Sequence, residues 1–89
     1  MTREEILAKA VMHYGIKHQM VKTLEELAEL SQAIAKLWVE EGDVANLAEE
    51  IADVRIMTDQ ITMALQLEDV VRRVEGEKLV RLKRRMEND

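Results

Sequence analysis

Two pairs of acidic residues have the spacing that brings side chains together on a helix. Glu26 and Glu29 are three positions apart, and Glu50 and Asp53 repeat that spacing further along the chain. Residues three apart on an α-helix have Cβ atoms roughly 5–6 Å from each other, so their carboxylates can share one hard cation. A set of ligands that offers only oxygen favours magnesium, with manganese as a substitute, over zinc.

The neighbours of the four acids strengthen the interpretation as a metal site. Both pairs lie among apolar residues such as Leu27 and Ile51. Adjacent carboxylates repel one another and partial burial makes their charges costlier, and a divalent cation removes both penalties. A di-iron bundle is not indicated, because His13 and His18 lack the Glu-x-x-His spacing. An ordinary solvated acidic face is the other interpretation, and the spacing alone leaves both open.

Long helices must carry these acids, because apolar residues recur at helical spacing and the chain contains no proline. A capping box of Thr2 and Glu5 starts the first helix, and Gly15 ends it. Asp43 is placed to cap the third helix. Gly76 weakens the fourth helix and is a place where it could kink or break. The predicted helices run up to Tyr14, then over about 17–40, 44–66 and 68–86.

The break at 41–43 predicts that the second and third helices pack antiparallel, which lets the two acidic pairs converge. At 1.5 Å per residue the pairs are offset by roughly 7 Å, a distance that helix tilt and side-chain reach can close. The second helix carries one long stripe, formed by Val21, Leu24, Ala28, Ser31, Ala35 and Trp38. The corresponding stripe of the third helix is formed by Leu47, Ile51, Val54, Thr58, Ile61 and Leu65. Because apolar residues lie around most of the third helix, we expect other helices to pack on more than one of its faces.

A single all-α domain over residues 1–89 follows, with a short first helix, two long antiparallel helices and a C-terminal helix. The apolar faces of the two long helices exceed what one short partner can cover. We therefore expect a four-helix-bundle-like fold that is completed by oligomerisation. A homodimer is the default and a homotetramer the alternative.

The charge of the chain limits its partners. The net charge of −5 argues against a general nucleic-acid binder, whose binding face should be strongly basic. The balance is uneven, because residues 72–89 contain seven bases and four acids. We expect no membrane association and a cytoplasmic location, because neither a signal peptide nor a membrane-spanning apolar run is visible.

The acidic motif and its context resemble the MazG-like all-α nucleoside triphosphate pyrophosphohydrolases. The motif is Glu25-Glu26-x-x-Glu29, followed after twenty residues by Glu50-x-x-Asp53. The stretches KTLEELAELSQAIAKLW and NLAEEIADVRIMTDQI are similar to the second and third helices of small, often phage-encoded members. The closing EKLVRLKRR resembles their last helix, so the similarity extends from about residue 14 to residue 85.

The resemblance implies hydrolysis of a nucleoside or deoxynucleoside triphosphate between the α- and β-phosphates, which releases the monophosphate and pyrophosphate. It implies that Glu26, Glu29, Glu50 and Asp53 bind Mg²⁺ and that Glu25, the leading acid, supports the site. Two alternatives keep the same fold: a non-catalytic helical dimerisation module, and a nucleotide-binding regulator. The enzyme is favoured because every motif acid is present.

Cations are needed for the phosphates that the metal does not reach. Lys78 and Arg81 are the leading candidates, with Gln19, Lys36 and Asn46 as further pocket residues. Trp38 and Tyr14 are expected in the core or an interface rather than stacked on a base. The methionines expected to fill gaps in the core are Met12, Met20, Met57, Met63 and Met86.

Overall fold

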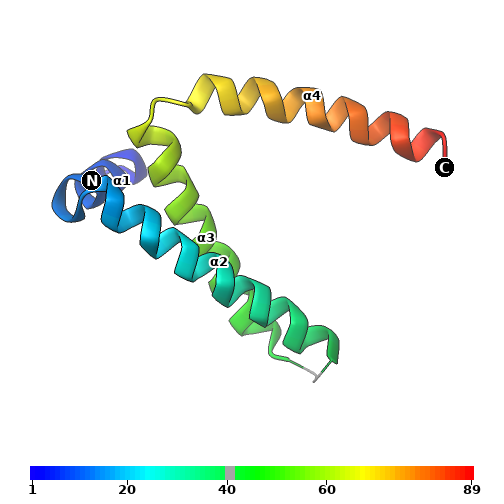
Figure 1. Cartoon of the computed structure of the whole chain (residues 1–89), viewed down its shortest axis with the longest axis horizontal. Coiled ribbons are helices and arrows are strands. Elements are labelled where there is room, and N and C mark those ends of the chain that lie inside the picture. The colour runs from blue at the N-terminus through cyan, green and yellow to red at the C-terminus, as the bar shows by residue number, and fades with distance from the viewer. Residues whose placement is uncertain (40–41) are drawn as a thin grey trace.

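The computed structural model describes residues 1–39 and 42–89, which form four α-helices (Figure 1). Their bounds are Arg3–Tyr14 for α1, Ile16–Val39 for α2, Val44–Ala64 for α3 and Glu68–Glu87 for α4. The predicted all-α class is confirmed, and the described residues contain no strand. The predicted end of the second helix at Glu40, and Glu41 of the predicted break, lie outside the described residues.

The predicted start of α1 and of α3 is confirmed by side-chain caps. Thr2 and Glu5 form a reciprocal capping box, in which the Glu5 amide donates to Thr2 Oγ1 over 3.1 Å. Asp43 caps α3, because its Oδ1 accepts a 2.8 Å bond from the Ala45 amide. Gly15 follows α1 with φ at 89°, a backbone region that side chains other than glycine rarely enter.

α3 ends two residues earlier than the sequence predicts. Gln66 adopts φ of 55°, and its amide donates to the Met63 carbonyl over 3.1 Å. The Leu67 amide then donates to the Thr62 carbonyl over 2.8 Å. These two bonds form a Schellman motif, which usually has glycine where this chain has Gln66. The prediction was wrong because glutamine is a good helix former and gives no stop signal.

Gly42 is required by a close approach of two backbone segments after α2. Its amide donates to the Lys36 carbonyl over 3.0 Å. A Cβ atom at this position would lie 2.7 Å from the backbone nitrogen of Leu37 and 2.9 Å from its Cα. Only glycine therefore fits at this position without moving the backbone.

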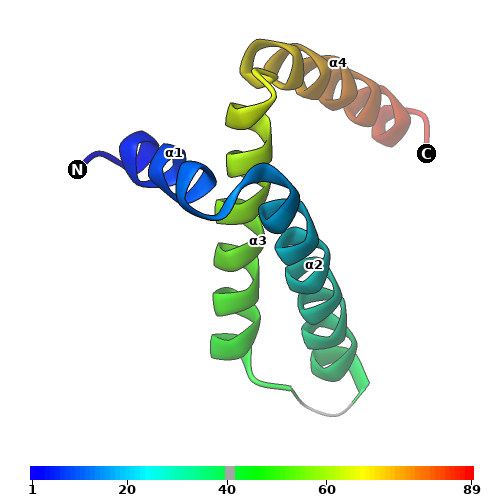
Figure 2. The same cartoon turned by 60° about the vertical axis from the view of Figure 1, so that its left-hand side comes forward.

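The body of the molecule is the antiparallel pair α2 and α3, with α1 packed across both near the end away from residue 42 (Figures 1 and 2). Arg3 ties α1 to α3 through a 2.6 Å ion pair with Asp59. α3 contacts α1, α2 and α4, whereas Ile51 and Ile56 on α3 stay exposed, so the predicted cover on more than one face is only partial within one chain.

α4 extends away from this body in both views (Figures 1 and 2). Among the described residues it contacts α3 and neither α1 nor α2, and no residue of α4 is buried. The helix continues through Gly76, so the break considered there does not occur.

The buried residues differ from those that apolar periodicity suggests. The buried apolar side chains are Leu7, Ala33 and Met57, and the buried polar ones are Gln19, Thr23, Glu26 and Gln60. The stripe predicted on the second helix is exposed instead, and Trp38 at its end is 89% exposed. Tyr14 is also exposed, as is Ile51 on α3.

The prediction of a methionine-filled core is confirmed for Met57 and wrong for Met12, Met20 and Met86, which are exposed. The common reason is that a single chain offers too few helix faces to cover its apolar surface. None of the four described helices is both long and apolar enough to cross a membrane.

Candidate metal centre

Three of the four predicted metal ligands meet between α2 and α3. Glu26, Glu29 and Glu50 each offer a carboxylate oxygen, and the three oxygens lie within 4.8 Å of one another. The first two come from α2 and the third from α3, so the antiparallel pairing brings the two sequence motifs together. The packing of α2 against α3 therefore brings acids of the two pairs together despite the offset between them that the sequence predicts.

Residue spacing on α2 explains why one of these acids is buried. The inward face of α2 repeats every four and three residues, and its buried or half-buried members are Gln19, Thr23, Glu26, Leu30, Ala33 and Leu37. Glu29 lies three residues beyond Glu26, at the exposed edge of this face. Glu50 is half-buried on the facing side of α3.

Two carboxylate oxygens of this group lack a hydrogen-bond partner among the residues that the structure describes. Glu26 is 7% exposed, and its Oε2 is buried without a hydrogen-bond partner. Oε2 of Glu50 has the same environment. A buried charged oxygen without a partner is costly, and native proteins rarely leave one so. The three acids together could hold a metal ion, because each offers one carboxylate oxygen to the same small space.

Lys22 was not predicted as part of the site, and the structure places it beside the acids. Its Nζ lies 3.3 Å from Glu26 Oε1 and 3.5 Å from Glu25 Oε2. The hydrogen bond and negative charge of Glu26, and then the charge of Glu25, raise the pKa of Lys22 above its ordinary value. The signal was present in the sequence, because Lys22 precedes these acids by four and three residues on a predicted helix.

Two of the predicted acids stand apart from the group of three. Asp53 is exposed and is not among the residues whose oxygens come within 4.8 Å. It lies one helical turn from Glu50, so a change of side-chain rotamer is the route by which it could join. Glu25 is exposed and contacts Lys22 rather than the other acids. The roles of both stay predictions.

A buried hydrogen-bond network continues the polar face toward α1. Gln19 Nε2 donates to Gln60 Oε1 over 2.8 Å, which links α2 to α3. His18 Nδ1 lies 2.8 Å from Gln19 Oε1 and must donate, because an amide oxygen only accepts. Thr23 donates its hydroxyl to the Gln19 carbonyl over 2.7 Å. Gln19, predicted to contact substrate, is thus a buried residue that joins the two helices.

The other predicted substrate residues are not gathered around the acids. Lys78 and Arg81 belong to α4, which makes no contact with α2 within the described chain. Lys36 is exposed in the last turn of α2, ten residues and about 15 Å along the helix from Glu26. Asn46 is exposed in the first turn of α3. Their contact with a substrate stays a prediction.

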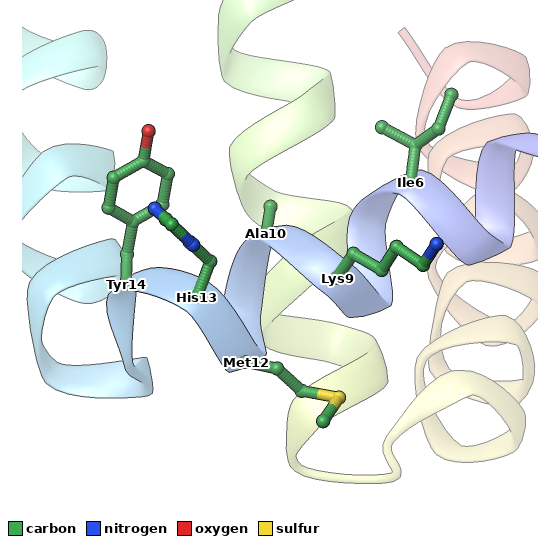
Figure 3. Close-up of a pocket in the computed structure, with 6 residues that line it drawn as sticks. All are labelled: Ile6, Lys9, Ala10, Met12, His13 and Tyr14. Carbon is green, nitrogen blue, oxygen red and sulfur yellow. The ribbon is translucent and has the colours of Figure 1, made fainter.

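A hollow of the surface lies elsewhere, along α1 (Figure 3). It has a volume of about 660 Å³ and is lined by Ile6, Lys9, Ala10, Met12, His13 and Tyr14. Tyr14 stacks on His18, with ring centroids 5.2 Å apart. Because all its lining residues come from α1 and none is an acid, this hollow is separate from the carboxylate group.

Comparisons with protein-family models, curated proteins and solved structures find no match to this chain. Its candidate function is therefore argued from its own residues and their geometry.

Proposed function

We propose that this chain is a Mg²⁺-dependent nucleoside triphosphate pyrophosphohydrolase that cleaves between the α- and β-phosphates. One observation carries the proposal: Glu26 and Glu50, on facing helices, each keep a buried carboxylate oxygen without a hydrogen-bond partner, within a group of three acids. In a helical bundle that served only as a scaffold, such oxygens would lower the stability of the fold without any benefit. A site that binds a divalent cation needs them.

The donor set fits magnesium. All three ligands are carboxylates, and the chain has no cysteine to attract a softer metal. Glu26, Glu29 and Glu50 would hold the ion, with Asp53 joining from one turn further along α3. Manganese prefers similar oxygen ligands and is the expected substitute.

The reaction is proposed from the motif together with the metal site. The acids that converge are those of the motif that resembles the MazG-like enzymes. Bound magnesium supplies neutralisation of phosphate charge and a lowered pKa for a coordinated water. The chain's own acids would position the ion, and Lys22, which lies 3.3 Å from Glu26, would be available to contact a phosphate. Hydrolysis then yields the nucleoside monophosphate and pyrophosphate.

The test is pyrophosphate release from a panel of ribo- and deoxynucleoside triphosphates, with and without Mg²⁺. Glu50→Gln and Asp53→Asn should each lower turnover by about 100-fold or more, because each removes a ligand charge that stabilises the transition state. Glu49→Gln is the matched control, since Glu49 is the exposed neighbour of Glu50 and carries the same charge. The control should retain turnover.

The assay also separates the alternatives. A folded chain that binds nucleotide with Mg²⁺ but releases no pyrophosphate is a nucleotide-binding regulator. A folded chain that binds neither metal nor nucleotide is a non-catalytic helical module. Equal loss of turnover in Glu49→Gln and Glu50→Gln would show that general negative charge, rather than the buried site, supports the reaction.

A further inference from the structure

The outer face of α2 is more apolar than the face that packs inside the molecule. Its members alternate in steps of four and three residues and are all exposed: Met20, Leu24, Leu27, Ser31, Ile34 and Trp38. Leu24 near its start is 67% exposed. This regular spacing is that of a seam between packed helices. An exposed row of apolar side chains is unfavourable in an isolated chain, so we expect another surface to cover the outer face of α2.

α4 presents a second apolar surface without cover. A hollow of about 370 Å³ lies along it, lined by Val71, Val74, Glu75, Lys78, Leu79 and Leu82. All these residues belong to α4, and Leu79 is 57% exposed. The apolar side of this helix is therefore open to a helix that the chain itself does not supply.

The accessible surface area of the chain indicates how much surface a second copy would cover. The accessible surface is 7282 Å² for a chain of 10.3 kDa. A compact monomer of that mass exposes about 5,400 Å², so the excess is roughly 1,900 Å² per chain. The radius of gyration, 15.9 Å, likewise exceeds the value of about 12 Å for a compact domain of this length. Two chains that buried this excess would form an interface of roughly 3,800 Å², the size of permanent dimers.

Charge indicates which surfaces meet. The stretch 16–64, which contains α2 and α3, holds ten acids and four bases. The second half of α4, residues 78–87, holds five bases and one acid. Opposite charges favour contact between these regions. Because α4 does not touch α2 of its own chain, a second chain is the source of such a contact.

From these observations we infer that α4 of each chain packs against the outer face of α2 in a second copy, so that two copies exchange their C-terminal helices. The exchange covers both apolar surfaces and brings the basic second half of α4 of one chain to the acidic pair of helices of the other. The exchange fits two-fold symmetry, because the contact of α4 with α2 occurs twice in the dimer, once for each copy. The inference stands independently of the metal chemistry.

Disulfide trapping tests the exchange, because the chain has no cysteine of its own. One chain carries Leu24→Cys on α2, and a second, distinguishable by a mass tag, carries a cysteine on α4 at position 71, 74, 79 or 82. The two chains are refolded together and oxidised. The expected product is a covalent heterodimer joining α2 to α4 for at least one α4 position. Trapping of α2 to α2 only, or of no pair at all, overturns the inference.

The mass of the unmodified chain in solution provides an independent measurement. Sedimentation at micromolar concentration should give two copies, or four copies built on the same contact. Leu24→Glu and Leu79→Glu should each reduce the mass to one copy while helicity by circular dichroism is kept, because both side chains are exposed within one chain. Met12→Glu is the control, since Met12 is 85% exposed on α1. A monomeric unmodified chain overturns the inference.

Discussion

Over the first half of α2 the two faces have opposite chemistry, and each is the reverse of what an isolated chain would favour. The buried face carries Gln19, Thr23 and Glu26, whereas the exposed face carries Met20, Leu24 and Leu27, each one residue further along. A rotation of the helix by a single residue position, about 100°, would put the apolar face inside. The helix does not make that rotation, so something other than burial of its most apolar residues sets its orientation.

Specific polar contacts set this orientation. The Gln19–Gln60 bond and the meeting of Glu26 with Glu50 both require the polar face to point toward α3. Separating Gln19 from Gln60 would leave a buried amide without its partner at a cost of about 1–3 kcal/mol, so a rotation that breaks this bond is penalised. Because the carboxylates of Glu26 and Glu50 repel each other, their meeting would favour this orientation only with a bound cation. This difference between the two faces agrees with the proposed metal site on the buried face and with the inferred contact between two copies on the exposed face.

Replacing the buried acid should have the largest effect, with opposite signs on activity and stability. Glu26→Met should lower pyrophosphate release by about 100-fold or more, because it removes a metal ligand. Without metal the same change should raise the free energy of unfolding by about 1–2 kcal/mol, because it removes the buried Oε2 that has no partner, whereas the ion pair with half-exposed Lys22 that is lost with it contributes little. Activity assays and urea unfolding measure the two effects.

The effect of Mg²⁺ on stability provides a second measurement of the role of Glu26. Saturating Mg²⁺ at about 100 times its dissociation constant should stabilise the unmodified chain by about 2.7 kcal/mol and leave Glu26→Met unchanged. Glu49→Met is the control, because it removes the same charge from an exposed position on α3. A loss of stability in metal-free Glu26→Met would show that Glu26 supports the fold rather than a site.

The glutamine pair should show an intermediate effect that depends on both partners. Gln60→Leu should lower the free energy of unfolding by about 1–3 kcal/mol, because Gln19 is then buried with an unsatisfied amide. The double variant with Gln19→Leu should recover most of this loss. Urea unfolding of the two single variants and the double variant gives the coupling energy. Additive losses would mean that the hydrogen bond does not orient α2.

The smallest effect concerns Lys22 and the pH dependence of stability. Its pKa is raised in the folded chain, mainly by Glu26, so the folded state holds this proton more tightly than the unfolded state does. The resulting stabilisation is present below pH 10.5 and is lost as the pH rises through the folded pKa. Proton titration of the Lys22 side chain by NMR should give a pKa above the ordinary lysine value of 10.5. Glu26→Gln should lower the Lys22 value, and an unchanged value would mean that this ion pair is absent in solution.

Much of the helical framework was predictable from local sequence. The capping box at Thr2, the cap at Asp43 and the stop at Gly15 each involve residues close together in the chain, so local chemistry decides them. The stop at Gln66 was not predictable, because nothing in glutamine indicates a left-handed backbone. Convergence of the acids on α2 and α3 was predictable because the spacing and the turn together determine it.

The sequence by itself determined the four helices, their antiparallel central pair and the acidic groups that this pair brings together. Only the tertiary structure decided which face of α2 points inward, that Lys22 joins the acids, and that α4 leaves the body of the molecule. The physical reason is the distance along the chain over which the deciding interactions act. Helix starts, stops and i,i+3 neighbours are set within a few residues, whereas the orientation of an apolar helix depends on which distant surfaces compete to cover it.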